Sequence, residues 1–272
     1  MFPLLQQEAE KLTKSSAFRY GDATSFSVPL AQGVSLPGTS SPADYLTLLD
    51  LKEVPARVLV VGAANGGIVA ELLKRGAKEV IAIETRDRFH NSLPAVLGLL
   101  AKGLQAEEKK GLAFRIFPDL PVTEDQQKTL GLFDLILWPE GSDEVTEPKK
   151  VLQGLAACLS PTGKLYAEIL HGSHGWSDRI NSWRPNMDAM IEASQVVFGK
   201  AWDNVHAGRG ETRRIYALSH AKRPEAPKPE EPKVEAPKPE APKAPAPAPT
   251  KIISKAQPKA APKPPVKPPE EA

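Results

Sequence analysis

RVLVVGAANGGIVAELLKRGAKEVIAIE, residues 57–84, combines a strand, a glycine-rich turn, a helix and a second strand that ends in an acid. In the first strand, residues 57–61, the positions after Arg57 are apolar and mostly β-branched without polar alternation, which is typical of a strand buried on both faces of a parallel sheet. Gly62, Gly66 and Gly67 form the turn, where glycine lets a ligand approach the main chain. Glu84 lies 22 positions after Gly62, a spacing that suits a carboxylate accepting hydrogen bonds from a ribose diol. The stretch therefore predicts the nucleotide-binding half of an α/β fold.

This stretch resembles motif I and the following strand of class I S-adenosylmethionine-dependent methyltransferases. In that family a strand of the form VLDVGCGTG is followed by a helix and an acid-tipped second strand. The chain departs from the motif at two positions, because Val60 replaces the usual acid and Ala64 replaces the middle glycine. The resemblance implies S-adenosylmethionine as the cofactor, with Gly62, Ala63 and Gly66 approaching its methionine and ribose moieties.

The resemblance also implies site residues outside the turn. Glu84 would bind the ribose hydroxyls, and Asp119 would contact the adenine amino group. Trp138 and Glu140 follow the fourth predicted strand, where the family keeps substrate-facing residues. Glu140 is the candidate general base or substrate anchor, and its alternative is an ordinary exposed loop acid. His171 follows the next strand at the same edge, so we expect it to contact the substrate; we predict no metal site.

Further strands alternate with segments able to form helices. We predict strands at 113–117, 133–138 and 163–170, then two strands, 201–207 and 212–219, joined by a short glycine-containing turn. The sequence thus predicts an α/β fold: a Rossmann-like, mainly parallel sheet with helices on both faces and a C-terminal antiparallel hairpin, followed by a disordered tail. The terminal hairpin resembles the methyltransferase fold and is absent from ordinary dinucleotide dehydrogenases.

The resemblance implies a methyltransferase-type domain (55–220) after an N-terminal helical or cap segment (1–54), and composition marks a Pro/Lys/Glu/Ala-rich tail (221–272). The tail holds 16 of the 28 prolines, so we expect it to be disordered, a spacer or an arm for a protein partner. Its net charge is +4, against −2 for residues 1–220. Nucleic acid is therefore not the expected partner, since the folded part carries no basic excess.

Other classes are excluded by simple counts. The single cysteine, Cys158, excludes an internal disulfide framework and cysteine-based zinc clusters, and we expect it to be buried. No apolar run approaches the ~20 residues that a membrane span requires, and the chain begins without the pattern of a secretory signal. We therefore expect a cytoplasmic protein that does not associate with a membrane.

Three functions remain open. The first is a methyltransferase that uses S-adenosylmethionine on a small molecule or a protein; base methylation is disfavoured because residues 138–140 lack the Asn-Pro-Pro type of motif. The second is a methyltransferase-like scaffold that has lost catalysis and engages a partner through its tail. The third is a nicotinamide-dependent oxidoreductase, but its third turn glycine would fall at Ile68, and no tyrosine has the required lysine four residues later.

Overall fold

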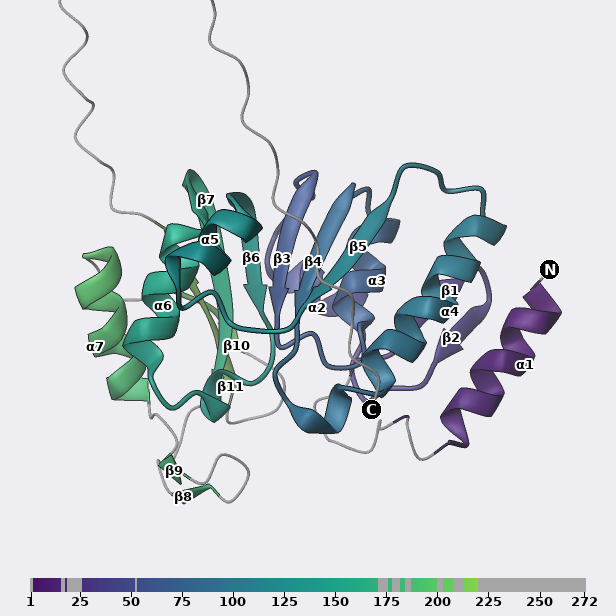
Figure 1. The fold of residues 1–272 in the computed structure, drawn as a ribbon, viewed down its shortest axis with the longest axis horizontal. Coiled ribbons are helices and arrows are strands. Elements are labelled where there is room, and N and C mark those ends of the chain that lie inside the picture. Colours follow the sequence, from purple (N-terminus) through teal and green to yellow (C-terminus); the bar gives the residue numbers. More distant parts are fainter. Residues whose placement is uncertain are drawn as a thin grey trace, which may run out of the picture. The chain divides into compact units, whose positions relative to one another are not determined.

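A seven-stranded sheet forms the centre of the fold in the computed structural model (Figure 1). The structure describes residues 2–15, 18, 26–51, 53–170, 176–177, 182–183, 187–199, 203–207 and 213–219. The strands of this sheet are β3 (Arg57–Val61), β4 (Glu79–Ile83), β5 (Ala113–Phe117), β6 (Phe133–Trp138), β7 (Leu159–Leu170), β10 (Asp203–Ala207) and β11 (Arg213–Leu218). Their spatial order is β10-β11-β7-β6-β3-β4-β5. Five strands are parallel, whereas β11 is antiparallel to both β7 and β10.

The predicted fold class is confirmed in its sheet, its helices and its terminal hairpin. Strands β3, β5 and β6 begin and end at the predicted residues, and β4 ends directly before Glu84. Strand β7 starts earlier than expected, at Leu159, because its pairing with β6 shifts register and accommodates the Ser160–Gly163 turn within the strand. The proposed disordered tail, residues 221–272, lies outside the described residues.

The order of the strands creates a switch point between β3 and β6. From β3 the chain runs outward through β4 to β5, and then returns to the other side of β3 to form β6 and β7. Neighbouring crossovers therefore leave β3 and β6 in opposite directions, and a crevice opens at the carboxyl ends of these two strands. Ligands of open α/β sheets bind at such a crevice.

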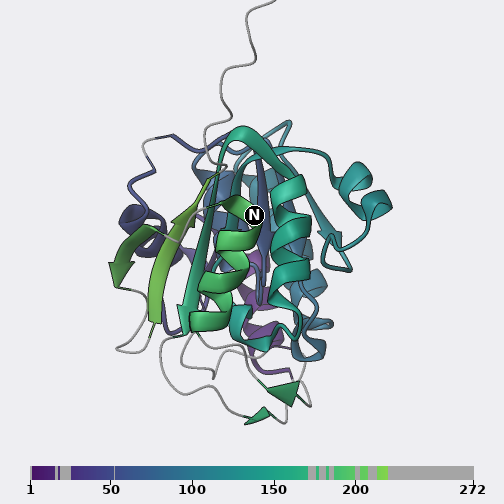
Figure 2. The same cartoon turned by 90° about the vertical axis from the view of Figure 1, so that its left-hand side faces the viewer.

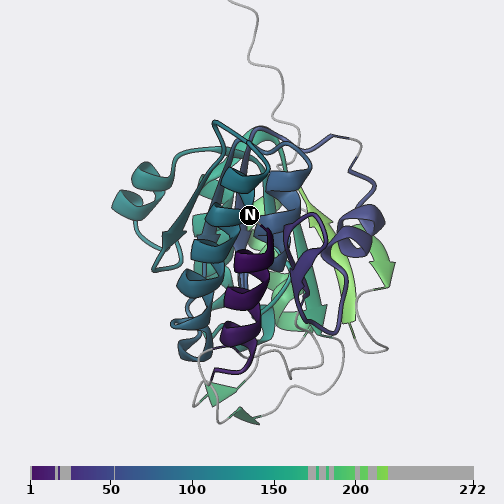
Figure 3. The ribbon, with the colours of Figure 1, turned by 90° about the vertical axis from the view of Figure 1, so that its right-hand side faces the viewer.

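Helices cover both faces of the sheet. Figure 2 shows α6 (Pro148–Ala157) and α7 (Met187–Phe198) side by side over one face, and Leu130 of α5 (Glu124–Leu130) joins their apolar cluster. Figure 3 shows α1 (Phe2–Thr13) beside α4 (Ser92–Ala106) on the opposite face, where α3 (Gly67–Lys74) also packs. The remaining elements are α2 (Pro42–Leu48), the short helices η1 (Asp87–Phe89) and η2 (Ser142–Glu144), and the strands β1 (Val28–Ala31), β2 (Val34–Leu36), β8 (Trp176–Ser177) and β9 (Ser182–Trp183).

The described strands of the N-terminal segment pack onto the helices α3 and α4. Strands β1 and β2 form a hairpin whose residues join the core cluster of α3 and α4. Close approach depends on Gly103 of α4, where an added Cβ would lie 2.0 Å from the carbonyl oxygen of Leu30. Ser41 caps α2, since its hydroxyl accepts a hydrogen bond from the Asp44 amide. This segment belongs to the same compact unit as the sheet.

Cys158 is buried at the C-terminal cap of α6, as expected. Burial raises the pKa of its thiol to about 11, so the group stays protonated and unreactive at neutral pH. In the described part of the chain, no helix is both long enough and apolar enough to cross a bilayer.

Two glycines of α4 provide a matched test of this packing. Gly103→Ala places a methyl group against the β1 backbone, and we expect it to lower the free energy of unfolding by about 1–3 kcal/mol. Gly98→Ala, with nothing within 4 Å of the added carbon, is expected to raise it by about 0.5–1 kcal/mol through helix propensity. Urea denaturation of both variants measures the difference. Equal effects at the two positions would show that β1 does not rest on Gly103.

Candidate functional site

A cavity of about 1130 Å³ opens at the carboxyl ends of β3, β4, β5 and β6. Five of the predicted site residues line it together: Gly62, Glu84, Asp119, Trp138 and Glu140. They converge because each lies at or just after the carboxyl end of one of four neighbouring parallel strands, and Trp138 and Glu140 share the end of β6. The crevice expected from the strand order is therefore a cavity, and five of the residues that line it are among those predicted from the sequence.

Two of the remaining predicted residues do not line the cavity, and the third is not described. Ala63 and Gly66 belong to the turn but do not line the cavity. Gly66 faces α4 instead, where an added Cβ would lie 3.3 Å from the side chains of Leu93 and Leu97. His171 lies outside the described residues. Among the described residues of the N-terminal segment, Phe18 alone contributes to the cavity.

The glycine-rich turn holds an unusual backbone. Gly62, Ala64 and Gly66 all have positive φ angles, of 68°, 49° and 82°. A left-handed conformation is strained for alanine, which explains why a glycine is the usual residue at position 64 of this motif. Hydrogen bonds hold the turn in place, because the amides of Gly62 and Ala63 both donate to the carbonyl of Ile83, at 2.8 and 3.1 Å. The turn is thus tied to the end of β4.

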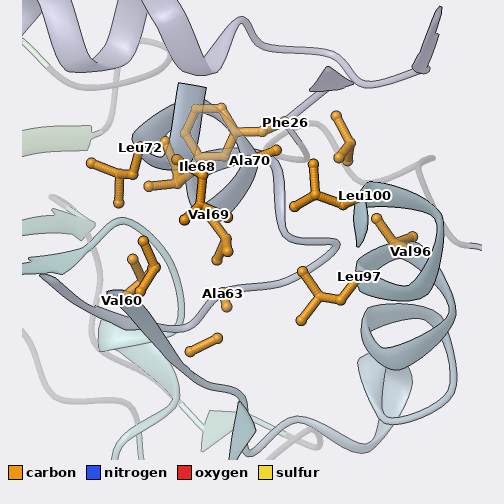
Figure 4. Packing of buried hydrophobic residues seen from close by; sticks show 14 of the residues in the cluster. Phe26, Val60, Ala63, Ile68, Val69, Ala70, Leu72, Val96, Leu97 and Leu100 are labelled. Atoms are coloured by element: carbon orange, nitrogen blue, oxygen red, sulfur yellow. The ribbon is translucent and has the colours of Figure 1, made fainter. Parts of the chain in front are cut away.

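Val60, the other departure from the motif, lies within the core. Its side chain is fully buried and belongs to the apolar cluster of Ala63, Ile68 and Leu97 (Figure 4). The surroundings of position 60 are therefore apolar, and they match the valine that replaces the acid.

Glu84 is the centre of the site's hydrogen bonding. Its carboxylate is 3% exposed and accepts four hydrogen bonds. Oε2 accepts from the Ala64 amide at 2.6 Å and from Arg86 Nη2 at 2.6 Å. Oε1 accepts from the Arg86 amide at 2.9 Å and from Arg86 Nε at 2.7 Å. One buried carboxylate therefore joins the turn to the segment after β4.

Arg86 extends this network to the end of β6. Its Nη1 donates to Glu140 Oε2 at 3.1 Å, and its guanidinium lies 4.6 Å from the centre of the Phe89 ring. Burial disfavours the charge, but hydrogen bonding and charge from Glu84, together with the charge of Glu140, outweigh burial and raise the pKa of Arg86 above its ordinary value. The guanidinium is cationic at every working pH. Glu140 is accordingly a buried, ion-paired carboxylate and not an exposed loop acid.

A second arginine pair lies beside the first. Arg88 donates to both carboxylate oxygens of Glu144, at 3.2 and 2.8 Å, and packs 5.0 Å from the same Phe89 ring. In total, six acidic and three basic side chains line the cavity. This excess of negative charge favours cationic or neutral ligands over anionic ones.

The sequence analysis missed Arg86, Arg88 and Phe89. The signal was the alternation of charges in ETRDRF, residues 84–89, directly after an acid-tipped strand. Among the residues that the structure describes, no group of three or more His, Cys, Asp or Glu side chains is arranged to hold a metal ion.

Comparisons with known proteins agree with this architecture. No family model matches the chain. Two curated proteins, each named ubiquinone biosynthesis O-methyltransferase, are 22% identical over 244 residues, which cover 78% of this chain and 97% of theirs. They come from Xanthomonas axonopodis pv. citri (strain 306) and Xanthomonas euvesicatoria pv. vesicatoria (strain 85-10).

Solved structures of EvdMO1 share the fold. Its N-terminal domain with SAH bound has a TM-score of 0.53 and 15% identity, and the match covers 81% of this chain and 98% of that domain. The same domain in the presence of SAH and D-fucose gives a TM-score of 0.52. A further structure of EvdMO1 matches with a TM-score of 0.51 and 17% identity. This chain spans about half the length of that one, since the match covers 47% of it. The fold is therefore that of the class I S-adenosylmethionine-dependent methyltransferases.

The buried carboxylate gives a stability prediction. Glu84→Gln removes the charge that pairs with Arg86 and turns amide hydrogens toward existing donors. We expect the free energy of unfolding to fall by about 3–5 kcal/mol, as when one partner of a buried ion pair is removed. Glu124→Gln, on the exposed side of α5, should change it by about 0.5 kcal/mol or less. Chemical denaturation compares the two, and similar small losses would contradict the network.

Proposed function

We propose that this chain is an S-adenosylmethionine-dependent methyltransferase that acts on a small molecule. One observation carries the proposal: Gly62, Glu84 and Asp119 line a single cavity at the switch point of a sheet with this topology. The curated relatives are O-methyltransferases by name, and EvdMO1 was crystallised with SAH and D-fucose. These relatives support methyl transfer to a small acceptor.

The residues of the cavity fit an adenosyl group. Both carboxylate oxygens of Glu84 accept from the side chain of Arg86, which also lines the cavity, and two acceptors on one carboxylate are what a vicinal diol requires. Asp119 is exposed at the rim, where its carboxylate is free to accept a hydrogen bond from an adenine amino group. The acidic lining suits a sulfonium cation. Val60 offers no acceptor for the methionine amino group, so backbone carbonyls must take that contact.

The protein's own contribution to catalysis is alignment and exclusion of water. The sulfonium group, when bound, supplies an already activated methyl group. Leu120, Val122 and Val145 give the cavity an apolar wall that limits water around the transferred methyl. Trp138 and Glu140 lie at the acceptor side, at the end of β6. Because its carboxylate is paired with Arg86, Glu140 is assigned as a substrate anchor in preference to a general base.

The two other hypotheses have less support. Nothing in the comparisons favours an inactive scaffold over an enzyme. The antiparallel β11 between β7 and β10 argues against a nicotinamide-dependent dehydrogenase, since ordinary members of that class lack this arrangement. Residues 55–220 are proposed to carry the activity, while residues 221–272, outside the described part, are proposed as a spacer or an arm for a protein partner. A protein acceptor is the second candidate substrate.

Calorimetric titration of the full chain tests the function. We expect S-adenosylmethionine and S-adenosylhomocysteine to bind and NAD not to bind. Asp119→Ala should weaken the binding of S-adenosylhomocysteine about 3–10-fold, through loss of one solvent-exposed hydrogen bond. Asp125→Ala, an exposed acid that does not line the cavity, is the control and should bind as the unmodified chain does. Binding of NAD without either sulfur compound would refute the proposal.

A further inference from the structure

We propose that Arg86 determines which ligands bind at Glu84, where the proposed function places the ribose of the cofactor. Its guanidinium occupies the two hydrogen-bond acceptor positions of the Glu84 carboxylate that a ribose diol must take. Only a ligand with an intact vicinal diol therefore displaces it. This inference rests on the proposed function. It concerns how the subsite selects its ligand, and it assigns to Arg86 a role that no motif residue carries.

The geometry of the ion pair carries the argument. Arg86 donates from Nε to one oxygen of Glu84, at 2.7 Å, and from Nη2 to the other, at 2.6 Å. A vicinal diol also offers two donors to the two oxygens of one carboxylate. The other two donors to Glu84 are backbone amides, of Ala64 and of Arg86 itself, and they remain when the side chain withdraws. The diol and the guanidinium are therefore alternative occupants of the same two acceptor positions.

Arg86 has a second partner that makes this exchange favourable. Its Nη1 already donates to Glu140 Oε2, and the Phe89 ring lies under the guanidinium. When a diol takes Glu84, Arg86 keeps a carboxylate and an aromatic face, and it does not become an unpaired buried cation. The displaced arginine then pairs with Glu140 alone, at the end of β6. Entry of the nucleoside is thereby coupled to the acceptor side of the cavity.

Specificity follows because every ligand that enters must compensate for the lost hydrogen bonds between Arg86 and Glu84. A ligand that enters this subsite breaks two charge-assisted hydrogen bonds between Arg86 and Glu84, which are among the stronger ones in proteins. A diol replaces both of them. A ligand without the two hydroxyls replaces neither, and leaves a buried carboxylate with fewer donors or leaves Arg86 in its place.

Substitution of the two neighbouring arginines tests this role. Arg86→Met removes the competing donors, whereas Arg88→Met removes the matched arginine that also contacts Phe89 but pairs with Glu144. Affinities for S-adenosylhomocysteine, adenosine and 2′,3′-dideoxyadenosine are measured by calorimetry on the full chain. We expect Arg86→Met to bind the first two at least tenfold more tightly than the unmodified chain, with less than a twofold change for dideoxyadenosine. Arg88→Met should leave the ratio of adenosine to dideoxyadenosine affinity unchanged.

A second measurement does not depend on the Met variants folding. In the ¹⁵N spectrum of the unmodified chain, the Nε–Hε signal of Arg86, identified by its loss in Arg86→Lys, should shift on addition of adenosine and not of dideoxyadenosine. Arg86→Lys retains the charge but cannot form both bonds, so its gain in adenosine affinity should be intermediate.

The outcomes separate the inference from the proposed function. If Arg86→Met binds S-adenosylhomocysteine as well as, or less well than, the unmodified chain, Arg86 is not a competitor of the diol and the inference fails while the function stands. If adenosine shows the expected pattern and S-adenosylhomocysteine binds no variant, the inference holds and the methyltransferase proposal fails. If neither ligand binds any protein at millimolar concentration, both fail.

Discussion

The site depends on one buried carboxylate. Glu84 connects the left-handed turn after β3, through the Ala64 amide, with the segment after β4, through Arg86. Arg86 in turn reaches Glu140 after β6. Three strand ends are thus joined by one chain of charged groups in a poorly solvated place, where ion pairs are strong only if every member is satisfied. The shape of the cavity follows from this network.

The main-chain contact between Gly62 and Glu140 adds a second constraint. An added Cβ at Gly62 would lie 1.9 Å from the carbonyl oxygen of Glu140, so the segment after β6 rests directly on the turn. Any larger residue at position 62 would push the end of β6 away. The turn glycine therefore serves the packing of two strand ends as well as the approach of a ligand.

Much of the fold was predictable from the sequence, for reasons that differ between elements. Strands β3 and β4 are continuous apolar runs bounded by glycine or acid, and such runs specify a buried parallel strand strongly. The meeting of Glu84, Asp119 and Glu140 followed from the rule that parallel strands end at one edge. The start of β7 was missed because Ser160-Pro161-Thr162-Gly163 has the residues of a turn, and its inclusion in the sheet depends on pairing with β6. The contacts of Arg86 with Glu84 and Glu140 were missed because they depend on side-chain geometry next to a short helical turn. Such geometry leaves no repeating pattern in the sequence.

The close packing of β1 against Gly103 of α4 has a consequence for how the chain folds during translation. Residues 28–31 emerge from the ribosome well before α4, the helix whose bare backbone receives them. Until then the apolar side chains of the N-terminal hairpin lack the part of their packing surface that α4 provides. Such a nascent segment is exposed to self-association and to chaperones, and its docking on α4 is a non-local step that completes this face of the domain.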